Sequence, residues 1–267
     1  MQPINQSARA FQAWTVLTEV ARRRTTITYG DLGEAIRVHH RAIRYVLGPI
    51  QSYCLEAGLP PLTILVVNKL GQLGTGFTAV DTDHHDHGRE SVWSCDWLSE
   101  ENPFEFASIG DSIETLLRDL VNAPEDSEEI TRLVKTRGIK QLLFKAALVK
   151  VYSGTCAFTG FSIGGGLEAC HIVAWENANS QQKMDVRNGI LLNALHHKLF
   201  DRGHITITKS YQIIYDDPKS KSRVHNKFES KCTTALHGKL MRIPQDFKHR
   251  PLPENIDEHH SLIGWNL

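Results

Sequence analysis

The sequence predicts an α+β protein with two folded parts, and three observations indicate this. The first 80 residues carry apolar side chains at helical spacing, followed by a short β-rich segment. Residues 81–130 hold 15 Asp/Glu against 2 Lys/Arg, which is typical of a solvated connecting arm. Residues 152–207 combine short apolar strands, Gly-rich turns and one helical segment. We therefore expect a first domain at 1–80, an acidic arm at 81–127 and a second domain at 128–267.

The composition is that of an ordinary soluble globular protein. Hydrophobic residues make up 41% and charged residues 22% of the chain, and no apolar run approaches the roughly 20 residues that span a bilayer. The first residues lack the charged-then-apolar pattern of a secretory signal, so we expect a cytoplasmic protein with no membrane partner. The five cysteines form no C-x-x-C pair, which favours free thiols over a zinc knuckle.

A net charge of zero conceals an uneven distribution of charge. Residues 1–80 hold 8 Lys/Arg against 4 Asp/Glu, and residues 131–267 hold 20 against 11. Phosphate binding depends on the local positive field, so the neutrality of the whole chain does not exclude a nucleic-acid partner. The alternative is that both basic excesses are ordinary solvated surface.

The first 80 residues predict a helical module. An amphipathic helix is expected at 7–24, a short strand at 27–29, and a short helix that begins near Asp31. A second short helix at 40–50 would follow a tight turn and carry Arg41 and Arg44 on its polar side, which is a helix-turn-helix pattern. A strand is expected at 62–68, before a Gly-rich turn.

Residues 25–77 resemble the winged-helix DNA-binding domain of O6-alkylguanine DNA alkyltransferases and alkyltransferase-like proteins. The matching pieces are TYGDL, AIRYVLG and the Gly-rich turn after VVN. The resemblance implies duplex binding, with 40–50 as the recognition helix and with Arg41 and Arg44 as contacts. The family's Pro-Cys-His-Arg active site is absent, because Leu62 and Thr63 stand in place of its Cys and His, so alkyl transfer is not expected. A small α/β scaffold without a DNA role is the alternative.

Two further helical segments precede the second domain's most informative stretch. One ends near Asn122, and the other covers 128–151 with basic residues on its outer face. Lys150 on that face is a candidate DNA contact, although a solvated charge run is the ordinary reading.

The stretch from 152 to 207 places histidines around short strands and a helix. A strand at 156–159, a Gly-Gly-Gly turn and a returning strand at 167–173 would put His171 near a strand end. Asn188-Gly189 then opens an apolar segment, 190–200, that becomes helical and carries a histidine pair. Another strand is expected at 204–208.

The text LEACHIVAW, NGILL and HHKLFDRG resembles the HNH endonuclease family. The resemblance implies a ββα-metal fold, a β hairpin and a helix that hold one divalent cation. It implies that His171 is the general base, that Asn188 ties a loop to the hairpin, and that His197 is a metal ligand. Asp201, four residues beyond His197 on the same helical face, is a candidate further ligand.

Four neighbours of these residues leave alternatives open. Many family members carry a metal-binding Asp or His where Cys170 stands, and we interpret Cys170 as a packing residue. Glu168 lies three positions before His171, off its face of the strand, and is placed in a supporting role. Of the adjacent pair, the family pattern selects His197 over His196. Arg202 is either a contact to the scissile phosphate or an ordinary charge at a helix end.

The predicted activity is metal-dependent hydrolysis of phosphodiester bonds in double-stranded DNA. A histidine with a pKa near ~6.5 accepts a proton from water at cellular pH, and a divalent ion stabilises the developing charge. Mg²⁺ or Mn²⁺ is expected first, and Zn²⁺ or Ni²⁺ are alternatives. Restriction or defence follows by analogy, and cutting both strands would need a homodimer or two visits. A DNA-binding regulator with an inactive HNH shell and a structural metal module are the competing interpretations.

Overall fold

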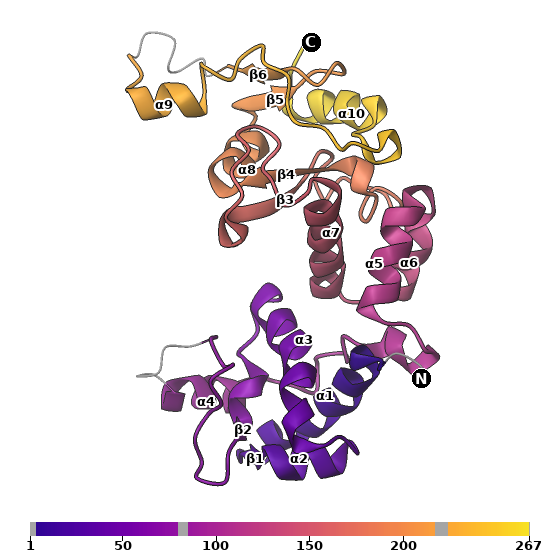
Figure 1. Ribbon diagram of the computed structural model, residues 1–267, viewed down its shortest axis with the longest axis vertical. Coiled ribbons are helices and arrows are strands. Elements are labelled where there is room, and N and C mark those ends of the chain that lie inside the picture. Colours follow the sequence, from indigo (N-terminus) through magenta and orange to yellow (C-terminus); the bar gives the residue numbers. More distant parts are fainter. Residues whose placement is uncertain (1–3, 80–84, 217–223, 267) are drawn as a thin grey trace. The chain divides into compact units, whose positions relative to one another are not determined.

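The computed structural model of the protein describes residues 4–79, 85–216 and 224–266 (Figure 1). The chain divides into two compact units. The first holds residues 1–116 and 133–142, and the second holds residues 117–132 and 143–267. Helices and strands are both present, which confirms the α+β class. Within the described part, every helix is too short or too polar to cross a membrane.

Four helices and two short strands form most of the first unit. Their bounds are α1 (Gln6–Arg22), β1 (Ile27–Thr28), α2 (Tyr29–Ala35), α3 (Ile43–Glu56), β2 (Val66–Val67) and α4 (His85–Ser94). The Asn5 side chain caps α1 by accepting from the Ala8 N–H. The predicted helix at 7–24 is therefore confirmed, and it begins one residue early because Asn5, rather than Ser7, supplies the cap.

Helices α1 and α3 pack against each other around an aromatic cluster. Trp14 lies edge-on to Tyr53, with ring centroids 5.4 Å apart, and edge-on to Trp97 and Phe104 as well. All four of these rings are buried. Such contacts between large side chains explain why α3 continues to Glu56, past the predicted end at residue 50.

The expected strand at 62–68 is wrong over its first half. Leu62–Leu65 form a buried 3-10 turn, and only Val66 and Val67 are in strand, where they pair in parallel with Ile27 and Thr28. A run of apolar residues cannot by its composition distinguish a buried turn from a strand. The winged-helix assignment of this unit stays a prediction.

Three helices follow: α5 (Ile113–Asn122), α6 (Ser127–Leu133) and α7 (Arg137–Val151). The predicted helix that ends near Asn122 is confirmed. The continuous helix expected over 128–151 is wrong, because residues 134–136 interrupt it. Val134 within this break is fully buried. Burial of this side chain in the connection therefore accompanies the interruption between α6 and α7.

The second unit is built on a hairpin and the helix that follows it. Strand β3 (Leu167–His171) pairs antiparallel with β4 (Gly189–Asn193), with Leu167 opposite Asn193 and His171 opposite Gly189. Helix α8 (Ala194–Asp201) starts directly after β4, capped by the Asn193 side chain, and it packs on β3 (Figure 1). This is the hairpin-plus-helix arrangement that the resemblance implied.

One local expectation in this region is wrong. Residues 156–159 form a turn and not the first strand of the hairpin; the Ala157 N–H donates to Leu191 O beside β4. The segment 190–200 is strand as far as Asn193 and helix only afterwards. Ile190, Leu191 and Leu192 are all fully buried, and that environment makes a strand out of a sequence run that also suits a helix.

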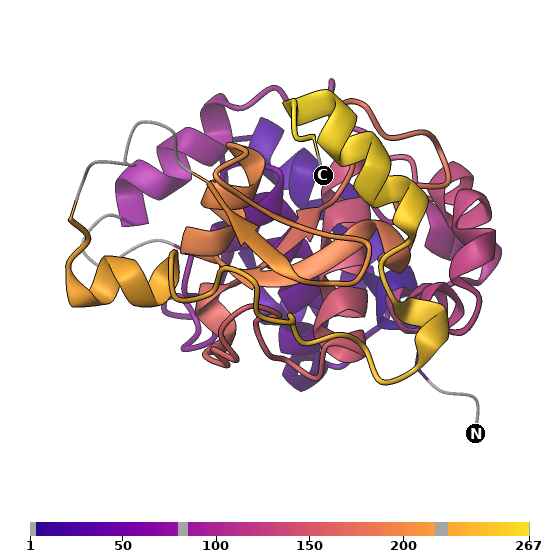
Figure 2. The same ribbon diagram turned by 90° about the horizontal axis from the view of Figure 1, so that it is seen from above.

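The remainder of the second unit covers this core. Strands β5 (Ile205–Ile207) and β6 (Ile213–Tyr215) form an antiparallel pair, which confirms the strand expected at 204–208. Helices α9 (Lys227–Cys232) and α10 (Pro253–Ile263) follow. Helix α10 lies beside β5 (Figure 2), where His260 Nε2 is 3.0 Å from Ile207 O.

Candidate functional site

His171 is the last residue of β3 and is held in place on several sides. Its Nε2 lies 3.1 Å from Lys183 O, and its ring stacks on Phe144 of α7 with centroids 4.0 Å apart. The Trp175 ring meets it edge-on. A carbonyl oxygen only accepts, so Nε2 carries the proton in this bond, and Nδ1 of the neutral ring is the nitrogen that can accept one.

Asn188 is fully buried and joins two segments that lie apart in the sequence. Its Oδ1 accepts from the Val173 N–H at 2.8 Å, and its Nδ2 donates to Val173 O and to Gln182 O, each at 3.1 Å. Residue 173 follows β3, and residue 182 precedes the carbonyl that holds His171. The Asn188 amide therefore links the loop at residue 182 to residue 173, which follows β3; its role in positioning His171 stays a prediction.

His197 and Asp201 lie four residues apart on α8 and face the same way. His197 Nε2 is 3.5 Å from Asp201 Oδ2. On its other nitrogen, His197 Nδ1 is 2.5 Å from Glu168 Oε2 of β3. The structure thus brings together both predicted metal ligands, and it adds a direct carboxylate partner that sequence reasoning placed only in a supporting role.

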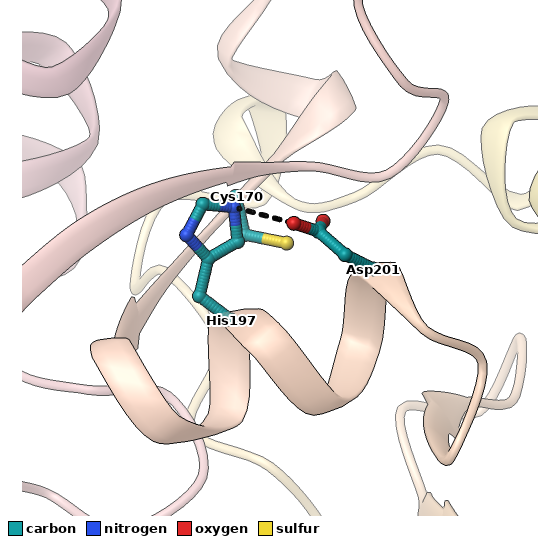
Figure 3. A group of neighbouring side chains, drawn as sticks. All are labelled: Cys170, His197 and Asp201. Carbon is teal, nitrogen blue, oxygen red and sulfur yellow. Dashed lines mark ion pairs between the residues drawn. The ribbon is translucent and has the colours of Figure 1, made fainter.

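Cys170 belongs to the same group of side chains (Figure 3). Ligand atoms of Cys170, His197 and Asp201 all lie within 4.8 Å of one another. A thiol, an imidazole and a carboxylate are a donor set that fits a divalent cation. Burial, followed by the negative charges of Asp201 and Glu168, raises the pKa of the Cys170 thiol well above its ordinary value. A packing role would explain why Cys170 is buried, but it would not explain why the thiol lies beside ligand atoms of His197 and Asp201.

His196 points elsewhere, so the two adjacent histidines are separated as the family pattern implied. Its ring is fully buried, with Nε2 at 2.9 Å from Cys232 O and Nδ1 at 3.0 Å from Asn193 Oδ1. Burial lowers the pKa of His196, although the bond to Cys232 opposes this effect. The residue therefore serves as a structural link between the start of α8 and the end of α9.

The four basic residues predicted to contact DNA are divided between the two units. Lys150 near the end of α7 and Arg202 at the end of α8 are exposed in the second unit. Arg41 and Arg44 belong to the first unit, where both line a cavity of about 420 Å³. Arg41 lies in a 3-10 turn and Arg44 in α3, where its guanidinium stacks over the Tyr45 ring at 4.5 Å.

The sequence pattern of β3 bears on Glu168 and Cys170, which were expected only in a supporting role and a packing role. Alternate residues of a strand share a face, so Glu168 and Cys170 of β3 point together, and His171 points to the other side. Only the packing of α8 on β3 shows that this face meets His197 and Asp201. If the helix that packs on β3 were known, the alternation of side chains along the strand would predict that Glu168 and Cys170 face it.

Comparison with known proteins agrees with this geometry. Residues 156–208 match the family described as HNH endonuclease, a segment that contains the hairpin, α8 and every residue of the group around His197. No curated protein matches the chain. The match covers the same residues whose sequence resembles the HNH endonucleases. It indicates nuclease activity and a nucleic-acid substrate. Residues 156–208 are therefore similar to the HNH endonuclease family, and this similarity covers the hairpin and α8.

Proposed function

We propose that the protein is a metal-dependent DNA endonuclease that hydrolyses phosphodiester bonds and leaves 5′-phosphate and 3′-hydroxyl ends. The observation that supports this most is the coincidence of the family match with a loop that orients His171 through Asn188 and Lys183 O. A role in restriction or in defence against foreign DNA is consistent with such an activity and rests on analogy.

The side chains supply distinct parts of the reaction. His171 takes the proton from the attacking water through Nδ1, while the bond to Lys183 O holds its tautomer. Asn188 keeps that carbonyl's loop in register with β3. His197 and Asp201 would hold a divalent cation, with Mg²⁺ or Mn²⁺ as the first expectation. When bound there, the cation supplies positive charge that stabilises the transferring phosphate and the leaving oxygen.

The first unit serves in this proposal as a second DNA contact. Arg41 and Arg44 line the same cavity with His40, and among the residues that the structure describes no acidic side chain lines it. Together with Lys150 and Arg202 in the second unit, they provide positive charge for phosphates on a duplex. The winged-helix resemblance supports the same assignment.

Incubation of supercoiled plasmid with the protein and Mg²⁺, Mn²⁺ or Zn²⁺, each in turn, tests the proposal. The wild type should produce nicked circles, and linear product would show cleavage of both strands. His171→Ala should lower the rate by roughly 10²- to 10⁴-fold, because a general base contributes that range. The exposed His237→Ala is the matched control and should cut like the wild type. Equal rates for wild type and His171→Ala would refute the enzyme, and tight binding without cleavage would favour a DNA-binding regulator.

A further inference from the structure

The group around His197 contains one side chain that departs from the family pattern: Cys170 stands where many members carry a metal-binding Asp or His. It is fully buried and shares the strand face of Glu168, the face that α8 covers. Its sulfur lies within 4.8 Å of ligand atoms of both His197 and Asp201 (Figure 3). Among the described residues, these three are the only Cys, His and acidic side chains so grouped.

The spacing within the group suits ligands of one small ion better than direct bonds between side chains. At 3.5 Å, His197 Nε2 and Asp201 Oδ2 are too far apart for a good hydrogen bond. Two ligands on a tetrahedral zinc-sized ion stand about 3.4 Å apart, given metal–nitrogen and metal–oxygen bonds of about 2.0–2.2 Å. The imidazole and the carboxylate are therefore already close to the positions that a shared cation requires.

Glu168 prepares His197 for this task. Its Oε2 accepts a hydrogen bond from the Nδ1–H of His197, with 2.5 Å between the two heavy atoms. In that tautomer Nε2 carries a lone pair, which is directed toward Asp201 and Cys170. A carboxylate behind a histidine is the usual means of fixing the tautomer and orientation of a metal-binding imidazole. The roles of the two carboxylates thus differ: Glu168 orients, and Asp201 binds.

We propose that Cys170 is a metal ligand, and that Cys170, His197 Nε2 and Asp201 form a three-ligand site selective for a thiophilic divalent cation of the Zn²⁺ class. This deepens the proposed nuclease function and rests on it for the identity of the site. Thiolate selects Zn²⁺ and its neighbours, whereas Mg²⁺ prefers oxygen ligands. Three protein ligands leave one position open for water or a phosphate oxygen, as sites that act on substrates do.

Cobalt spectroscopy of the full-length protein tests the assignment. Metal-free protein, titrated with Co²⁺, should bind one equivalent and develop thiolate-to-cobalt charge-transfer absorption that Zn²⁺ abolishes on displacement. Cys170→Ala should lose that absorption and bind Zn²⁺ at least tenfold more weakly. Cys95→Ser is the matched control for a partly exposed thiol and should keep the band. Glu168→Ala should keep the band but weaken Co²⁺ binding about 10- to 100-fold.

Further variants separate this assignment from folding and from the nuclease proposal. Cys170→Asp restores an ionisable oxygen ligand, and it should bind metal without the thiolate band and with affinity moved toward Mn²⁺. His171→Ala should slow cleavage by the roughly 10²- to 10⁴-fold given above but keep the cobalt spectrum of the wild type. A band that persists in Cys170→Ala, or a wild type that binds Co²⁺ without one, would overturn the assignment. Loss of cleavage alone would not, because the spectrum reports the ligand independently of the reaction.

Discussion

At the scale of single residues, Asn188 is a fully buried side chain that joins the segment after β3 to the loop at residue 182. Its amide satisfies three backbone groups of Val173 and Gln182 inside the protein. Asn188→Ala should lower the free energy of unfolding by roughly 2–4 kcal/mol, because buried donors and acceptors would be left without partners. Urea denaturation measures this change.

The neighbouring Asn177 provides the control for this measurement. Its side chain is exposed, so Asn177→Ala should change the free energy of unfolding by less than about 0.5 kcal/mol. If the two alanine variants were equally stable, the hydrogen bonds of Asn188 would not hold the loop, and the positioning of His171 would need another explanation.

A second prediction at this scale concerns acid stability. His259 stacks on Phe200 with centroids 4.3 Å apart, and burial, reinforced by repulsion from His260, lowers its pKa to about 4. Between about pH 6.5 and 4, His259 is therefore protonated in the unfolded chain but neutral in the folded protein. Stability should be fully present above about pH 6.5 and should fall by roughly 3 kcal/mol as pH drops toward 4.

Denaturation curves at several pH values test this titration. In His259→Phe, which keeps an aromatic ring beside Phe200, the fall in stability between pH 6.5 and 4 should be smaller by about one proton's contribution. The exposed His87→Gln is the control and should retain the wild-type slope. An unchanged slope in His259→Phe would assign the acid sensitivity to other groups.

At the scale of secondary-structure elements, the packing of α7 on β4 passes through Gly189. A Cβ at this position would come within 2.6 Å of Phe144 Cζ and 2.7 Å of Leu148 Cδ1. Gly189 also lies opposite His171 in the hairpin register, and Phe144 is the ring on which His171 stacks. The Asn-Gly pair, common in turns, is thus required here by the close approach of a helix to a strand.

Gly189→Ala should therefore affect both stability and activity. Overpacking should destabilise the protein by about 1–3 kcal/mol, and displacement of Phe144 should lower the cleavage rate through His171. Thermal unfolding and the plasmid assay report the two effects. Gly165→Ala is the control, because a Cβ there meets nothing within 4 Å, and it should leave both unchanged. A wild-type rate in Gly189→Ala would show that the stack on Phe144 does not position His171.

At the scale of the whole molecule, the charge distribution matters more than its sum. The chain is neutral overall, yet Arg41 and Arg44 stand together beside one cavity. If both contact phosphates, their double alanine variant should bind duplex DNA more weakly. The slope of log affinity against log salt should also become shallower by about 2.

Binding isotherms at several salt concentrations measure that slope. The double variant Arg22→Ala, Arg23→Ala removes the same charge from the same unit, but both of these arginines pair with Glu19 on α1. Its salt slope should stay near that of the wild type. Equal slopes for the two double variants would leave Arg41 and Arg44 without a role in DNA binding and would remove the main support for the winged-helix assignment.

The roles of His171, Asn188 and His197 stay predictions, whereas the sequence by itself determined the HNH match of residues 156–208 and the helices that became α1 and α5. These inferences succeeded because helical periodicity and motif spacing are local properties of the chain. Whether 156–159 or 189–193 pairs with β3 was not determined, because both are short apolar runs. The extended backbone of either suits a hairpin.

Only the tertiary structure decided the surroundings of the site. Glu168 and Cys170 meet His197 because α8 folds back onto β3, and no local pattern encodes which face a helix covers. The same holds for Gly189, whose need for a bare Cα arises from α7, some 40 residues earlier in the chain. Contacts between distant segments depend on packing of the whole unit, and this packing places the Cys170 thiol beside His197 and Asp201.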